Sequence, residues 1–205
     1  MPYTRENRKN SENSGKRYVI LEGAIKVFTK NGFKATSMDE IADVAGVSKR
    51  TIYNHFFSKE GLFQAIVSDY VEFRNEIKHI EYSQTLPIRD QLKKFVFAEL
   101  FFIVDPVRRG LARLLASTFI MDDAFRKQTF GLYQSHDDFV TWLNAAKENK
   151  MLQFDNPELT THIFYGLVEG CLIWPALLTD GESGKNTEPV IDEIISIFLS
   201  RYGGD

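Results

Sequence analysis

A short stretch from Lys49 to His55 gathers side chains whose chemistry suits nucleic acid. Arginine and lysine bind guanine O6 and N7, asparagine binds adenine, and threonine and tyrosine commonly bind phosphate. All but one of the side chains in the stretch can make such a contact, namely Lys49, Arg50, Thr51, Tyr53, Asn54 and His55. The stretch therefore predicts a DNA-contacting surface, with Lys49, Arg50 and Asn54 as the base contacts.

The neighbouring residues have the spacing of a helix-turn-helix. When twenty positions are counted from Met38, the small Ala42 is fifth, where two helices cross closely. Gly46 is ninth, in the turn, and Ile52 is fifteenth, where it packs the second helix onto the first. This geometry presents the start of the second helix, expected over about residues 49–56, to a DNA major groove.

Serines mark where the helices of this region begin. Ser37 and Glu40 form a capping-box pattern, in which the serine oxygen accepts from the amide at the third helical position and Glu40 reaches back to the cap amide. Ser48 is a second N-cap, and Ser58 caps a longer helix over about residues 59–80. Each cap predicts a helix start next to the candidate surface.

Four residues beside the helix expected at 49–56, which we call the reading helix, complete the predicted DNA-binding set. Thr36 and Ser37 stand at the start of the first helix of the motif, where free backbone amides favour a phosphate. Ser48 caps the reading helix, and Lys59 adds a positive charge near the same surface.

Helical spacing recurs along the rest of the chain, without a clear strand pattern. Apolar residues at i, i+3 and i+4 predict helices, and the residue before a proline tends to leave the α region and end one. Of about nine predicted helices, six lie outside the motif and its connector, at about 15–31, 88–104, 107–120, 123–149, 157–178 and 188–202. The prediction is an all-α protein.

The charge of the chain is unevenly spread over its 205 residues. The formal net charge of −3 argues at first against a nucleic-acid partner. Residues 1–61, however, hold eleven Lys or Arg and seven Asp or Glu, which makes +4, and the remainder carries −7. We predict a basic leader at 1–15, a DNA-binding domain at 16–61 and a second domain at 62–205, connected by the helix at 59–80.

Neither a membrane segment nor a disulfide framework is indicated. The longest run without a charged or polar side chain, Gly170 to Leu178, is far shorter than the ~20 residues that a span needs. The single cysteine, Cys171, fits a reducing compartment and is expected to be a buried packing residue. The predicted location is the cytoplasm.

About twenty positions between residues 16 and 66 share type and spacing with a known family. They are Ile20-Leu21, Ala24, Phe28, Gly32-Phe33, Thr36-Ser37-Met38, Ile41-Ala42, Ala45-Gly46-Val47-Ser48, Thr51-Ile52-Tyr53, His55-Phe56, Ser58-Lys59-Glu60 and Leu62. This pattern resembles the DNA-binding domain of TetR/AcrR-family transcriptional regulators. Gly61 departs from it, because the family often has a polar residue there. The C-terminal half is similar, less specifically, to an AcrR/AefR-like branch.

The resemblance implies an all-helical homodimer with a three-helix DNA-binding domain and a larger C-terminal domain. In that family the C-terminal domain binds a small molecule and dimerises through its last two helices. Ligand binding changes the spacing of the two DNA-reading domains and releases a palindromic operator. The expected function is a ligand-responsive repressor, without enzymatic activity, cofactor or metal.

The second half of the chain supplies candidates for these two roles. Ligand pockets between helices are mostly apolar with a few polar anchors. The candidate ligand-binding residues are Phe101, Arg113, Phe119, Tyr133, His136, Tyr165, Glu169 and Trp174. The candidate dimerisation residues, on broad apolar helix faces, are Ile163, Leu167, Leu178, Ile191, Ile194 and Phe198.

Two other functions remain open at this point. One is a helical small-molecule-binding protein with a vestigial DNA-binding domain, which the basic face of residues 49–56 argues against. The other is a metal-dependent hydrolase built on His136, Asp137 and Asp138, with His79 and Asp180 as further ligands. Asp137 and Asp138 are better explained as a solvated helix face.

Overall fold

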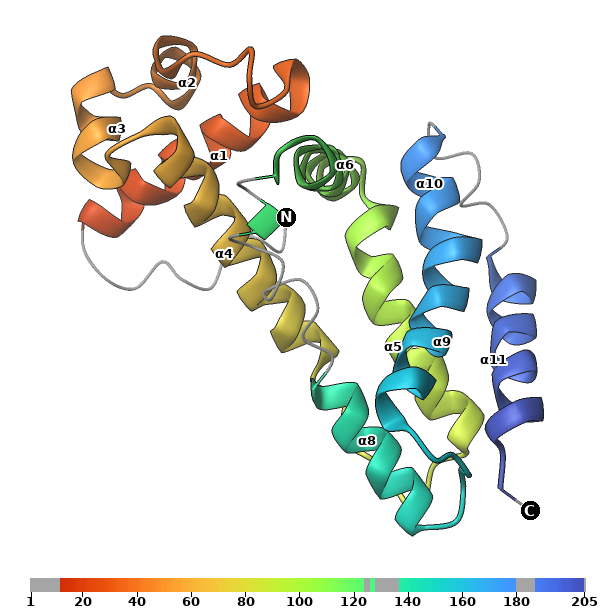
Figure 1. Ribbon diagram of the computed structural model, residues 1–205. Helices are drawn as coiled ribbons and strands as arrows, with labels where there is room; N and C mark the ends of the chain where they lie inside the picture. The colour runs from red at the N-terminus through yellow and green to blue at the C-terminus, as the bar shows by residue number, and fades with distance from the viewer. Residues whose placement is uncertain (1–11, 124–125, 128–136, 180–186, 205) are drawn as a thin grey trace. The chain divides into compact units, whose positions relative to one another are not determined.

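The computed structural model describes residues 12–123, 126–127, 137–179 and 187–204 (Figure 1). In these residues the regular structure is helical, and the one β-type pairing is an isolated bridge between Leu152 and Gly203. The predicted all-α class is confirmed. The chain forms two compact units, which we call the N-terminal unit (residues 1–74 and 113–130) and the C-terminal unit (residues 75–112 and 131–205). The domain boundary expected at residue 61 stays a prediction.

The N-terminal unit contains the helices that the motif required. In chain order they are α1 (Glu12–Asn31), α2 (Met38–Ala45), α3 (Lys49–Phe56), α4 (Lys59–Lys78) as far as Arg74, and the part of α6 (Pro106–Met121) from Arg113 onward. The predicted starts and ends of α2 and α3 agree with these bounds. The caps that predicted them are local signals within one helical turn, which is why they could be read from neighbouring residues.

Aromatic rings close the core of the N-terminal unit. The Phe28 and Phe63 rings meet edge to face with centroids 5.4 Å apart, and the Phe33 ring lies 4.8 Å from Phe63. Phe28 and Phe63 are fully buried, and each such side chain stabilises a fold by about 1.5–3 kcal/mol. These contacts join α1, α4 and the loop before α2. They fix the part of the unit against which α2 and α3 pack.

The C-terminal unit consists of the remaining helices. They are α5 (Ile88–Val104), the first turns of α6, α8 (Asp137–Glu148), α9 (Pro157–Val168), the π-helix η2 (Glu169–Ile173), α10 (Trp174–Leu178) and α11 (Glu188–Tyr202). The helix predicted at 123–149 is described as α8 from Asp137 onward, and much of its first half lies outside the described residues.

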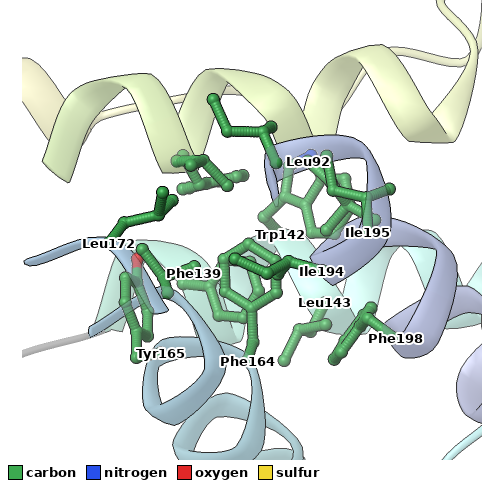
Figure 2. Close-up of a cluster of buried hydrophobic side chains, with 14 of the residues drawn as sticks. Leu92, Phe139, Trp142, Leu143, Phe164, Tyr165, Leu172, Ile194, Ile195 and Phe198 are labelled. Carbon is green, nitrogen blue, oxygen red and sulfur yellow. The ribbon is translucent and has the colours of Figure 1, made fainter. Parts of the chain in front are cut away.

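The core of the C-terminal unit is a cluster of apolar side chains from α5, α8, α9, η2, α10 and α11 (Figure 2). Phe139 and Trp142 of α8 stack with their rings 5.7 Å apart, and Phe164 of α9 stacks on Phe139 at 4.7 Å. Leu92 of α5 and Ile194 of α11 close the cluster. The sequence-based expectation that Phe139 and Trp142 face inward is confirmed.

A buried amide fastens the chain between α4 and α5 to this core. The Gln91 Nε2 donates to the carbonyl oxygens of Ser83 and Leu86, both at 2.8 Å. Its Oε1 accepts from the Ser83 amide at 2.8 Å and from the Trp142 indole at 3.2 Å. Because buried polar groups are costly unless they are hydrogen-bonded, this set of partners specifies the position of the connecting loop.

Pro175 changes the helix that precedes it. Proline has no N–H to donate and its ring crowds the carbonyl four residues back. The chain responds with the π-helical turn η2, in which the Trp174 amide bonds to the Glu169 carbonyl. Cys171 lies in this turn and is exposed, so its predicted burial was wrong. The wider turn shifts residues around the helix axis, and the buried positions become Val168, Leu172 and Ala176.

The continuous helical stretch Pro157–Leu178 is long and apolar enough to cross a membrane, by length and composition alone. It has 22 residues, and an 18-residue window within it has a mean hydropathy of 1.3 and is 33% buried. The core helix of a soluble protein passes the same test, and this helix supplies Phe164 and Tyr165 to the core in Figure 2.

Candidate nucleic-acid interface

Gly46 makes the tight turn between α2 and α3. Its backbone has φ 67° and ψ 33°, the left-handed conformation that glycine adopts without steric cost. The Gly46 amide bonds to the Asp43 carbonyl at 3.3 Å, and the Val47 amide bonds to the Ala42 carbonyl at 3.1 Å. These bonds satisfy the last carbonyls of α2 and turn the chain directly into the next N-cap, as the helix-turn-helix spacing predicted.

Serine caps begin both helices of the motif. Ser37 accepts from the Glu40 amide at 3.2 Å, and Ser48 accepts from the Thr51 amide at 3.1 Å. Only half of the predicted capping box forms, because the Glu40 carboxylate instead accepts from the Asn31 side chain at 2.8 Å. The hydroxyl groups of Ser48 and Thr51 also bond to each other at 2.8 Å, which stiffens the first turn of α3.

The side chains of α3 divide into an inner and an outer face. Ile52 and Phe56 are buried against the unit's core. Lys49, Arg50, Tyr53 and Asn54 are exposed, and they form one stripe because residues four apart lie above one another on a helix. The three residues predicted to contact bases are therefore together on the outer face, with Tyr53 between them.

Lys49 is held by a carboxylate that lies outside the predicted DNA-binding set. Its Nζ lies 2.9 Å from the Asp39 Oδ2, which joins the first turn of α3 to the first turn of α2. The hydrogen bond from Lys49 to Asp39, reinforced by their charges, raises the pKa of Lys49 above its ordinary value. Asp39 was missed because the ten-residue separation gives no local signal of the pairing.

Thr36 and Lys59 fasten the loop between α1 and α2. Thr36 is only 3% exposed, and its hydroxyl donates to the Gly32 carbonyl at 2.8 Å. The Lys59 Nζ donates to the carbonyls of Phe33, Lys34 and Thr36 at 3.0, 3.2 and 3.0 Å, and lies 4.8 Å above the Phe33 ring. Both residues thus shape the approach to α2, whatever they contribute to DNA contact.

A compact turn passes the chain from α3 to α4. Phe57 has φ 61° and is 85% exposed, and the Ser58 amide bonds back to the Phe56 carbonyl at 2.7 Å. Ser58 caps α4 by accepting from the Gly61 amide at 3.0 Å, as predicted. A β-carbon on Gly61 would lie 2.3 Å from the Phe56 carbonyl oxygen. The family departure at residue 61 is therefore required by this turn.

The predicted ligand-binding residues do not form one described cluster. Phe101 lies under the Arg108 guanidinium at 4.0 Å, Tyr165 is buried among the aromatic rings of Figure 2, and Trp174 is exposed. The other described candidates are half-buried residues with contacts of their own, namely Arg113 and Phe119 in the N-terminal unit and Glu169 in the C-terminal unit. Tyr133 and His136 lie outside the described residues.

The predicted dimerisation residues divide by burial. Ile191, Ile194 and Phe198 are buried in the core of their own chain, and Leu167 packs against that core. Ile163 and Leu178 are exposed. Four further apolar side chains on these helices are also exposed: Leu159, Trp174, Val190 and Ile197.

The hydrolase alternative finds little support in the described residues. The His79 Nδ1 lies 3.3 Å from Asp138, but no group of three His, Cys, Asp or Glu that could hold a metal occurs within the described part of the chain. His136 and Asp180 lie outside it.

Two family models match the chain. One, described as bacterial regulatory proteins of the tetR family, matches residues 20–66. The other, described as the C-terminal domain of AefR-like transcriptional repressors, matches residues 90–204. The HTH-type transcriptional regulator YvkB of Bacillus subtilis is 40% identical over 188 residues, covering 91% of this chain and 96% of YvkB. With YhgD of the same organism, the match spans only 46% of the relative's length.

Solved structures agree with these matches. A TetR family transcriptional regulator from Pseudomonas syringae pv. tomato is 28% identical, with a TM-score of 0.77, and the alignment covers 92% of this chain and 97% of that one. The flavonoid-responsive regulator FrrA is 25% identical with a TM-score of 0.72, over 93% and 98% of the two chains. Since the C-terminal match alone spans more than half of the sequence and YvkB aligns over nearly its whole length, this chain belongs to the TetR family of DNA-binding, non-enzymatic transcriptional regulators.

Proposed function

We propose that this regulator is a repressor that binds a palindromic operator as a homodimer, acts in the cytoplasm, and leaves the operator when a small, largely apolar molecule binds. The single observation that carries the DNA-binding part is the outer face of α3. Lys49, Arg50 and Asn54 are exposed there, while Ile52 and Phe56 hold the helix from below. Side chains of these types on a supported reading helix can contact base edges in a major groove.

The distribution of charge supports the same proposal. Residues 1–61 carry a formal charge of +4, and the rest of the chain carries −7. Phosphate attraction supplies most non-specific affinity for DNA, so the excess of positive charge favours contact through α2, α3 and their surroundings. Of the predicted basic leader at residues 1–15, residues 1–11 lie outside the described part of the chain.

Exposed apolar side chains on α9, α10 and α11 support a homodimer. Apolar side chains on the surface of a lone chain are normal when scattered, but a continuous group favours an interface. Here Leu159, Ile163, Leu178, Val190 and Ile197 are exposed on helices that pack together in one unit. A two-fold dimer would present two copies of α3 to half-sites roughly 34–36 Å apart, or at a multiple of that spacing.

The release by a small molecule rests on similarity. The FrrA regulator is described as flavonoid-responsive, and its alignment covers 93% of this chain and 98% of FrrA. Aromatic side chains outside the packed core, such as Phe101 and Trp174, suit planar apolar molecules. We therefore place the effector among small aromatic or otherwise largely apolar compounds.

Fluorescence anisotropy with DNA from upstream of the protein's own gene tests the operator contact. Replacing Arg50 by alanine should weaken specific binding roughly 5- to 150-fold, because a good base contact is worth about 1–3 kcal/mol. Lys26→Ala is the matched control, since Lys26 is an exposed cation on α1, outside the motif. Equal losses for the two variants, or no binding by the unaltered protein at low salt, would refute the assignment.

The same measurement tests release. Addition of flavonoids and other planar aromatic compounds should lower the anisotropy of the protein–DNA complex for at least one compound class. If the complex forms and none of a broad apolar panel changes it, the effector part of the proposal fails while the DNA-binding part stands.

A further inference from the structure

The ion pair between Lys49 and Asp39 brings a cation and an anion to the same point of the candidate interface. The two charged atoms are 2.9 Å apart, with the two side chains 47% and 69% exposed. Wherever the tip of Lys49 meets DNA, the Asp39 carboxylate is therefore present as well. A carboxylate near a phosphate is repelled, so the Asp39 carboxylate favours a point of contact on DNA that donates a hydrogen bond.

Donors of this kind are few on the exposed edges of B-DNA. In the major groove, only the amino groups of cytosine (N4) and adenine (N6) donate, and each lies beside an acceptor of its own base pair. In a G·C pair these neighbours are N4 and O6, which are hydrogen-bonded to each other and so stand about 2.9 Å apart. That separation matches the spacing between the Lys49 and Asp39 charges.

The flanking groups distinguish G·C from A·T. Guanine offers N7 next to O6, so a lysine there meets two acceptors, and the carboxylate on N4 has only the C5–H group of cytosine beside it. In an A·T pair, a carboxylate on N6 would lie beside the acceptor N7, and the lysine on O4 would face the thymine methyl group. Both edges offer a donor beside an acceptor, but the groups that flank them favour the G·C edge.

On the basis of the proposed operator binding, we infer that Asp39 and Lys49 act as one reader of a single G·C base pair in each half-site. Lys49 donates to guanine, and Asp39 accepts from the amino group of cytosine. Asp39 is then a specificity-determining residue, because at an A·T pair the adenine N7 acceptor lies beside the only donor that its carboxylate could use.

The existing ion pair does not prevent this exchange. Exposed pairs of this kind contribute only about 0–1 kcal/mol to stability, so each side chain can reorient its free N–H groups or lone pairs toward a base at little cost while the two charged atoms stay close. In the free protein, the ion pair holds Lys49 over the start of α2. Its ammonium group therefore already lies beside the Asp39 carboxylate before the two residues contact the base pair.

Selection from a pool of duplexes with a random 20-base-pair core, using the full-length protein, tests the inference. We expect the unaltered protein to enrich a motif that contains one oriented G·C position in each half-site. Asp39→Ala should reduce the preference at that position by roughly tenfold and leave the other positions unchanged. Lys49→Ala should weaken the preference at the same position.

Asp43→Ala is the matched control, because Asp43 is an exposed carboxylate one turn along α2 and its loss changes the charge equally. Thermal unfolding of each variant checks that the fold is retained. If Asp39→Ala tightens binding to all sequences uniformly, or if Asp39→Ala and Lys49→Ala affect different positions, the inference is overturned while the operator-binding proposal stands. If the unaltered protein enriches no motif, both fail.

Discussion

At the scale of single residues, similar donors turn out to have different roles. Arg50 and Asn54 present exposed side chains, whereas the Thr36 hydroxyl is used inside the loop before α2. Lys59 is the clearest case, because an ammonium has three N–H groups and three carbonyl oxygens lie within 3.2 Å of it. Through these hydrogen bonds, Lys59 holds the start of α4 against the loop that leads into α2.

Replacement of Lys59 by methionine should lower the free energy of unfolding by about 1–3 kcal/mol, because charge-assisted bonds to three carbonyls, two of them partly buried, are lost. Operator affinity should fall too, since the loop next to α2 is no longer held. Lys34→Met removes an exposed cation from the same loop and should leave stability nearly unchanged. Circular dichroism melts measure the stability of both variants. Equal melting temperatures would show that the Lys59 hydrogen bonds do not stabilise the loop.

At the scale of elements, the junctions between helices are more constrained than the helices. The chain leaves α3 through Phe57 at φ 61°, and this brings the Phe56 carbonyl against the first turn of α4. Such a backbone conformation is rarely adopted by residues other than glycine, so it persists only where its surroundings impose it. The second junction, at Pro175, is resolved by a π-helical turn and not by a helix end.

Gly61→Ala should therefore be destabilising, although alanine is the better helix former. Its β-carbon would lie 2.3 Å from a backbone oxygen that cannot swing away, so α4 or the turn must shift. We expect a loss of about 1–3 kcal/mol, as for other overpacking substitutions. Denaturant unfolding measures it.

Gly15→Ala in α1 is the control for helix propensity, because nothing lies within 4 Å of the point where its β-carbon would stand. It should leave stability unchanged or raise it slightly. A Gly61→Ala variant as stable as the unaltered protein would show that the turn is not a tight constraint.

At the scale of the whole molecule, each chain keeps apolar surface that its own core does not use. Ile191, Ile194 and Phe198 of α11 are buried in the core, but Val190 and Ile197 of the same helix are exposed. A helix that is apolar on more than its inward face has a second partner in many oligomers. The homodimer proposed above supplies one.

Ile197→Glu should convert the dimer to a monomer, because a charge would be desolvated at the interface, while the 46% exposure of Ile197 means that the fold of one chain tolerates it. Light scattering after size exclusion measures the mass. Phe97→Glu is the control, since Phe97 is an exposed apolar residue on α5. If Ile197→Glu remains a dimer, or if the unaltered protein is monomeric, this interface is excluded.

Local patterns were enough to predict the helix-turn-helix, its caps and the all-α class. The bonds from Ser37 to Glu40 and from Ser48 to Thr51 join residues three apart, so the amino-acid order determines them directly. Helix periodicity likewise predicted the inward positions of Phe139 and Trp142.

Contacts between residues that are distant in the chain were decided only by the tertiary structure. Lys59 meets carbonyls 23 to 26 residues away, and Lys49 meets Asp39 ten residues away. Which apolar side of α11 is buried depended on α5 and α9, and the exposure of Cys171 depended on the turn before Pro175. A pattern of residue types gives the set of groups able to bind, but the partner that is closest in space decides which of them stay available at the surface.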